Sequence, residues 1–171
     1  KRNEDSVAHM HIDNHGRIVL FAELFIQRKQ SLRNLNGTLY GFKMLAGSAE
    51  VSGGDVTSKG SLTFIAGHLT LKSEWSEDAK WLNLNLNQTQ TGDATFEIAK
   101  GGSFVKHGSC YTYIGNDPKW KSRLYVNGGT YSMPYPERLY LNGAINGSGV
   151  WTGSNDGNGI LEIDNGGVFE N

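Results

Sequence analysis

Aromatic side chains gather in the last third of the chain, and two of them sit between aliphatic residues. In LYV (124–126) and LYL (139–141), a strand that buries its aliphatic residues points the tyrosine outward. Exposed aromatic rings stack on the apolar faces of sugar rings, while Asn, Asp and loop backbone groups hydrogen-bond to hydroxyls. These residues predict a carbohydrate-binding surface, although the same tyrosines would also suit structural ladders between stacked strands. The candidate binding residues are Tyr113, Trp120, Tyr125, Tyr131, Tyr135, Tyr140 and Trp151.

Three carboxylates occupy alternate positions of strand-like segments and are predicted to face outward at equivalent places. They are Glu97, Glu162 and Asp164, with Lys121, Arg123 or Arg138 as an accompanying basic residue. Acid–base cleavage of a glycosidic bond needs two carboxyl groups about 5–10 Å apart. Single charges on the outer face of a strand usually only solvate it. We therefore assign no catalytic residue, and a polysaccharide lyase or glycoside hydrolase is the alternative to a binding module.

Two segments contain metal-ligating residue types without an established spacing. HMHIDNH (9–15) has three histidines and an aspartate on alternate positions, but it lies in a polar lead-in without a rigid frame. SNDGNGILEID (154–164) has oxygen donors suited to calcium, and a turn closed by Asn and Gly explains it without an ion. GNDPKWKS (115–122) is not a phosphate-binding loop, because Trp120 stands where that motif needs glycine. We predict neither a metal nor a cofactor.

A short template recurs along the chain and predicts the elements that would position these residues. Alternating apolar residues lead into one or two glycines, and an apolar or aromatic residue follows. The clear copies are FEIAKGGSF (96–104), LYVNGGTY (124–131) and LEIDNGGVF (161–169), and weaker copies begin at Ala49 and Leu62. Each copy predicts a strand with one buried face. The glycines then supply backbone conformations with positive φ at a sharp bend.

Two architectures account for such a template. Hairpins at each copy would build a β-sandwich, whereas a parallel β-solenoid would use each glycine pair as a corner between stacked coils. Only stacked coils require consecutive strands to share one template, because equivalent positions then lie on one another. The sequence therefore favours an all-β parallel solenoid, with the β-sandwich of hairpins as the alternative.

The pattern Leu-x-Ile-x-x-Gly-Gly-x-Phe, over about residues 49–171, resembles the coils of right-handed parallel β-helix proteins. These include the pectate-lyase-like superfamily and the passenger domains of autotransporter adhesins. The resemblance implies a right-handed parallel β-helix that is secreted or displayed at the cell surface. It also implies a module that binds or cleaves a polysaccharide or host glycan, or a structural stalk without a ligand.

The domain organisation is predicted to be simple, because 171 residues suit one domain. Residues 49–171 would form the coils, and residues 1–48 an N-terminal lead-in with a capping segment. Within that lead-in, RIVLFAELFIQRKQSL (17–32) is the only candidate helix, and an edge strand is the alternative. A full copy of the template lies just before Asn171. We therefore expect either stacking against a partner at this end or a continuation of the coils.

Composition limits the class of partner. The chain has 37% hydrophobic residues, 19% charged residues and 23 glycines, a profile of turn-rich β proteins rather than helical ones. A net charge of −1 offers no basic stripe for nucleic acid or an anionic membrane. The longest apolar run, residues 18–22, is too short to cross a bilayer. We expect a polysaccharide or glycan partner, with no nucleic acid and no membrane insertion.

Overall fold

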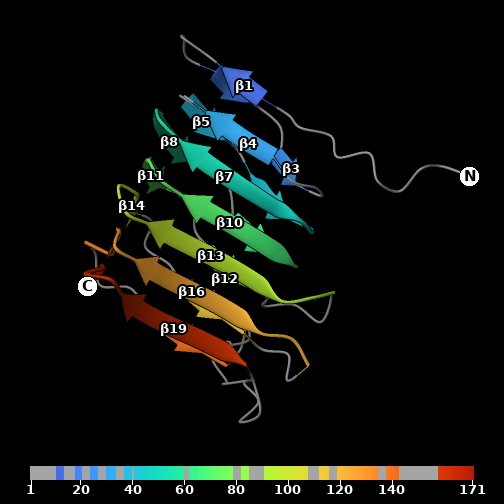
Figure 1. The fold of residues 1–171 in the computed structure, drawn as a ribbon, viewed down its shortest axis with the longest axis vertical. Coiled ribbons are helices and arrows are strands. Elements are labelled where there is room, and N and C mark those ends of the chain that lie inside the picture. Colours follow the sequence, from blue (N-terminus) through green and yellow to red (C-terminus); the bar gives the residue numbers. More distant parts are fainter. Residues whose placement is uncertain are drawn as a thin grey trace, which may run out of the picture.

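The computed structural model consists of short strands arranged in three sheets (Figure 1). It describes residues 11–13, 18–20, 24–26, 30–33, 37–39, 41–59, 62–78, 82–84, 91–107, 112–115, 119–134, 138–142 and 158–171. All regular elements in these ranges are β-strands. The described residues therefore include no helix that is long and apolar enough to cross a lipid bilayer.

Each sheet is a ladder of strands that are far apart in the sequence. Sheet 1 runs β1 (His11–Asp13), β4 (Gln30–Arg33), β7 (Ser48–Ser52), β10 (Gly67–Leu71), β13 (Ala94–Ala99), β16 (Ser122–Asn127) and β19 (Gly159–Asp164). Sheet 2 runs β2 (Ile18–Leu20), β5 (Gly37–Leu39), β8 (Asp55–Ser58), β11 (Glu74–Glu77), β14 (Ser103–Lys106), β17 (Thr130–Ser132) and β20 (Val168–Glu170). Sheet 3 runs β3 (Leu24–Ile26), β6 (Phe42–Met44), β9 (Leu62–Phe64), β12 (Leu82–Leu84), β15 (Thr112–Ile114) and β18 (Leu139–Leu141).

The chain visits the three sheets in turn and then returns to sheet 1 one strand further along (Figure 1). Every pairing between the named strands is parallel, and consecutive strands are never partners. This confirms the predicted all-β class. The alternative of a sandwich of hairpins is wrong, because a hairpin needs antiparallel neighbours.

The template recurs because its equivalent positions stack on one another. Phe96 pairs with Leu124 and Leu124 with Leu161, so one inward row takes its residues from three copies. The glycine pairs of these copies all lie between a strand of sheet 1 and a strand of sheet 2. Gly128, for example, has a φ of 75°, which favours glycine. The weaker copy that begins at Leu62 is different, because it joins sheet 3 to sheet 1.

Of the two alternatives for residues 17–32, a helix or an edge strand, the helix is wrong. This segment contains β2, β3 and most of β4, one strand for each sheet. Strands β2 and β3 lie at the ends of their sheets, as the edge-strand alternative proposed. Strands β1 to β6 belong to the same three sheets as the strands that follow them in the chain.

An aromatic ladder runs through the core on the inward side of sheet 2. Trp75, Phe104, Tyr131 and Phe169 are register partners on successive strands. The ring centroids of Phe104 and Tyr131 are 5.4 Å apart, and those of Tyr131 and Phe169 are 5.1 Å apart with an interplanar angle of 3°. Aromatic rings bury about 150–250 Å² each, so this ladder is a major source of apolar burial.

Two oppositely charged side chains lie in the same core. Glu77 and Lys106 are register partners on β11 and β14, and neither is exposed to solvent. Ser58, the register partner of Glu77 on β8, donates a hydrogen bond to the Glu77 carboxylate. Trp75 in turn donates its indole N–H to the Ser58 Oγ at 2.7 Å. This polar row is costly to bury, so its members depend on one another.

Candidate functional site

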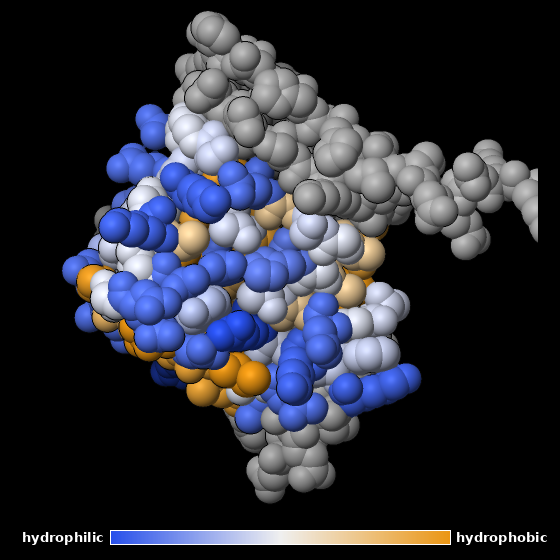
Figure 2. All heavy atoms as spheres, viewed as in Figure 1, coloured by the Kyte–Doolittle hydropathy of each residue, from blue (hydrophilic) through white to orange (hydrophobic). Residues whose placement is uncertain are grey.

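The outer side of sheet 1 carries a set of polar side chains that interact across several neighbouring strands. On its strands, inward residues such as Leu69, Phe96 and Leu124 are fully buried, so the residues between them face outward. Hydrophilic residues predominate on this side of the molecule (Figure 2). We call this surface the sheet 1 face. It comprises Glu50, His68, Thr70, Lys72, Glu97, Arg123, Tyr125, Asn127 and Glu162.

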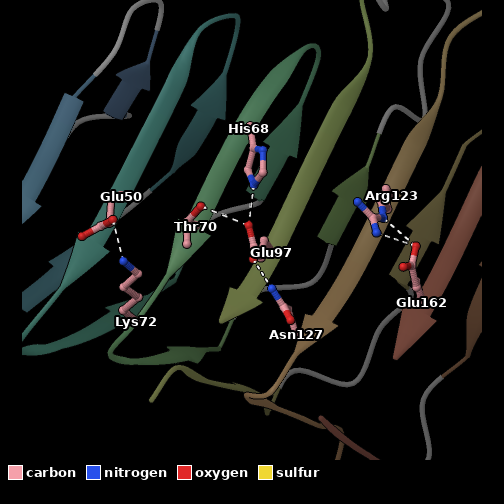
Figure 3. Close-up of polar contacts among 8 residues, drawn as sticks. All are labelled: Glu50, His68, Thr70, Lys72, Glu97, Arg123, Asn127 and Glu162. Atoms are coloured by element: carbon pink, nitrogen blue, oxygen red, sulfur yellow. Dashed lines mark hydrogen bonds and ion pairs between the residues drawn. The ribbon is translucent and has the colours of Figure 1, made fainter. Parts of the chain in front are cut away.

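Glu97 is the centre of the sheet 1 face (Figure 3). Its Oε2 atom lies 2.8 Å from His68 Nε2 and 3.4 Å from the Thr70 hydroxyl. Its Oε1 atom accepts a hydrogen bond of 2.6 Å from the side-chain amide of Asn127. The three donors come from the strands on either side of β13, so pairing of the sheet brings them together. The Glu97 side chain is only 15% exposed.

These contacts keep Glu97 ionised. Burial by itself raises the pKa of the Glu97 carboxyl, but four further influences outweigh it. They are the hydrogen bonds from Asn127 and His68, the positive charge of His68, and the hydrogen bond from Thr70. The net result is a pKa below the ordinary value of 4.5. A carboxyl group of this kind is a hydrogen-bond acceptor at neutral pH and a poor proton donor.

Glu97→Gln is expected to destabilise the protein at neutral pH and to have less effect in acid. Because the folded-state pKa of Glu97 lies below the unfolded-state value, its ionised form stabilises the fold above pH 4.5. That contribution is lost as the pH falls through the folded-state pKa. Urea unfolding of both proteins between neutral pH and pH 3 measures the difference. Parallel stability curves for the two proteins would contradict the assigned network.

Two ion pairs flank the Glu97 network (Figure 3). Lys72 Nζ lies 2.9 Å from Glu50 Oε2. Arg123 contacts Glu162 Oε2 through Nη2 at 2.6 Å and through Nε at 2.8 Å. The Arg123 guanidinium carbon also lies 3.8 Å from the centroid of the Tyr125 ring, a cation–π geometry. The face is thus held together by contacts between strands.

The predicted stacking of carboxylates is correct for two of the three. Glu97 and Glu162 are both register partners of Tyr125, so they share one outer row, with Tyr125 between them. Asp164 belongs to the row of Asn127. Two strand steps separate Glu97 from Glu162, about 10 Å. Glu162 is paired with Arg123, and Glu97 has a lowered pKa. This arrangement provides acceptors rather than the acid that glycosidic cleavage requires.

Two of the seven predicted binding aromatics are buried, which corrects their assignment to the surface. Tyr131 is fully buried because it follows the glycine pair and returns to the inward side, where its hydroxyl lies 2.8 Å from Thr112 Oγ1. Tyr113 is 3% exposed and stacks on Tyr140, with ring centroids 5.3 Å apart. Neither ring can therefore form part of an external wall.

The other predicted aromatics do not share one surface. Tyr125 is half-buried on the sheet 1 face. Tyr140 is half-buried on β18 in sheet 3, and Arg138 Nη1 is 3.5 Å from its hydroxyl. Trp120 is half-buried just before β16, and Lys119 Nζ lies 4.7 Å from its ring centroid. Tyr135 and Trp151 lie outside the described residues. Tyr125 is therefore the predicted aromatic residue that joins the polar network.

Several residues of the sheet 1 face were not predicted from the sequence. His68, Thr70 and Asn127 are the donors to Glu97, yet they lie at least 27 positions from it. Between β10 and β11 the chain has Lys72 and Ser73, where other copies of the template have glycines. The template is therefore hard to recognise in the segment that contains β10 and β11. Aligning the inward rows Ala49, Leu69, Phe96, Leu124 and Leu161 would have placed the donors beside Glu97.

The described residues contain no group of three or more His, Cys, Asp or Glu side chains arranged to hold a metal ion. His9, His15 and Asp156, which belong to the two segments with metal-ligating residue types, lie outside the described residues. The chain has no match among protein-family models, curated proteins or solved structures.

Proposed function

We propose that the chain is a right-handed parallel β-solenoid module, secreted or displayed at the cell surface, that binds a polysaccharide through the sheet 1 face. The regular return of the chain to each sheet supports a solenoid, since each repeat adds one strand to each ladder. Parallel crossover connections are right-handed in about 98% of known cases, which supports the handedness.

One observation carries the binding proposal: Tyr125 lies among polar side chains that other protein groups already orient. Arg123 lies over its ring, and Glu97 and Glu162 are its register partners. Sugar-binding sites combine an aromatic surface with a few well-placed donors and acceptors. Side chains held by cross-strand contacts lose little conformational freedom when a ligand binds, which favours affinity.

The dimensions of the face also suit an extended ligand. The donors His68 and Thr70 come from β10, and Asn127 comes from β16. These strands are two steps apart, about 10 Å. A ligand that contacts both must be longer than a single sugar ring. This favours an oligosaccharide or polysaccharide over a monosaccharide.

Tyr125→Ala is expected to weaken polysaccharide binding about tenfold, the equivalent of roughly 1.4 kcal/mol. The thermal midpoint should change little, because surface substitutions usually stay within about 0.5 kcal/mol. A polysaccharide panel identifies the ligand by retention in affinity electrophoresis, and the dissociation constant is then measured for both proteins. The panel is also read for new reducing ends and unsaturated products, which would indicate cleavage instead.

The matched control is Tyr125→Phe, which keeps the ring beneath Arg123 and should retain most of the affinity. If Tyr125→Ala binds as tightly as the native chain, the ligand is not on this face. Absence of retention across the whole panel would overturn the binding proposal itself.

A further inference from the structure

We infer that the sheet 1 face selects uncharged polysaccharides over acidic ones; this inference rests on the proposed function and specifies its ligand class. The observation behind it is that each cationic side chain of the face already has a carboxylate partner. Lys72 is bound to Glu50 at 2.9 Å, and Arg123 to Glu162 at 2.6 Å. The imidazole of His68 also faces a carboxylate, with its Nε2 atom 2.8 Å from Glu97 Oε2.

The resident carboxylates occupy the positions that an acidic ligand would need. Recognition of a uronate or sulfate depends on charge-assisted hydrogen bonds from Arg or Lys. On this face Glu50 already offsets the charge of Lys72, and Glu162 that of Arg123. A ligand anion that reaches the remaining N–H groups of these cations also meets the repulsion of the neighbouring carboxylate. Glu97, with its three donors, remains a further negative charge between the two pairs.

The same arrangement suits the hydroxyl groups of a neutral sugar. Glu50 and Glu162 use only Oε2 in their ion pairs, and each side chain is 41% exposed. Figure 3 shows one oxygen of Glu50 turned away from Lys72. A carboxylate accepts up to about four hydrogen bonds, so these oxygens can accept hydroxyl protons while the ion pairs stay intact. A hydroxyl donates and accepts without adding charge, whereas a carboxylate ligand offers these acceptors nothing.

The first experiment compares polysaccharides that share a backbone and differ in charge. The full chain is tested against hydroxyethyl cellulose and carboxymethyl cellulose, and against methyl-esterified and free polygalacturonate. We expect the uncharged member of a pair to be retained, with a dissociation constant that changes less than about twofold between low and high salt. Tighter binding of the acidic member, weakened by salt, would overturn the inference while leaving polysaccharide binding intact. Failure to bind any polymer, in these pairs or in the broader panel, would overturn both.

The second experiment releases one cation of the face. Glu162→Gln keeps the side-chain shape but leaves Arg123 without its anionic partner, so binding of the acidic polymers should rise about fivefold. The matched control is Glu74→Gln on the outer side of β11 in sheet 2, which changes the net charge equally. That control should leave acidic binding at the native level. An equal gain in both variants would attribute the effect to net charge and would overturn the role of the Arg123–Glu162 pair.

Discussion

Lys106→Met is expected to lower the free energy of unfolding by about 3–5 kcal/mol. Lys106 and Glu77 are fully buried register partners, so removing the lysine leaves the Glu77 carboxylate in the core without its neighbouring positive charge. For a chain of this length, each kcal/mol corresponds to roughly 2–4 °C in the midpoint of thermal unfolding. Urea denaturation and thermal scans at neutral pH measure the loss.

The double variant Glu77→Leu with Lys106→Met distinguishes charge compensation from simple packing. A buried ion pair replaced by apolar side chains of similar size is often neutral or stabilising, so the double variant should be much more stable than Lys106→Met alone. Lys72→Met is the control, because it breaks the exposed pair with Glu50 and should cost less than about 1 kcal/mol. If the two mutations of the double variant cost additive amounts, the buried charges do not act as a pair.

Gly129→Ala is expected to destabilise the protein by about 3 kcal/mol or to prevent folding. A Cβ atom at this position would lie 2.6 Å from the Ala99 carbonyl oxygen and 2.7 Å from that of Gly102. Both oxygens belong to the backbone of the preceding repeat, so they cannot move aside as a flexible side chain could. Circular dichroism and urea unfolding of the purified variant test this expectation.

Gly166→Ala is the matched control for the corner. Gly166 occupies the same kind of turn and has a φ of 77°, but no atom lies within 4 Å of its ideal Cβ position. This substitution should cost only the backbone strain of a left-handed residue, about 1–2 kcal/mol. Gly129 itself is not among the glycines with positive φ, so its substitution tests contact alone. Equal destabilisation by the two variants would mean that contact with the preceding repeat costs no more than the left-handed backbone of a corner glycine.

Local features of the sequence were sufficient to predict the class of fold. Alternation in FEIA (96–99) and LYVN (124–127) indicates strands with one buried side, and both segments form strands in sheet 1. The glycine pairs indicate the turns that follow, because few other residues adopt positive φ. These signals act within a few residues of the backbone, so they can be read without knowledge of distant partners. The outward position of Tyr125 follows from the same alternation.

Local signals failed where the burial of a residue depended on what stacks above and below it. Tyr131 was predicted to be a surface ring, yet it lies between Phe104 and Phe169 in the aromatic ladder. Residues 17–32 left a helix and an edge strand open as alternatives, and the structure has strands β2, β3 and most of β4 there. The burial of Lys106 has no local signal, because a lysine is stable in the core only where a neighbouring strand supplies an opposite charge.

Alternation within single strands thus specified the strands and the outward orientation of the Tyr125 side chain, and the glycine pairs specified the turns. The register between strands alone decided which side chains meet. Glu97 contacts His68 and Asn127, residues 29 and 30 positions away, because parallel pairing sets them side by side on neighbouring strands. Periodicity is a property of the backbone within one strand, whereas register depends on the lengths of all intervening turns and on the packing of the whole core.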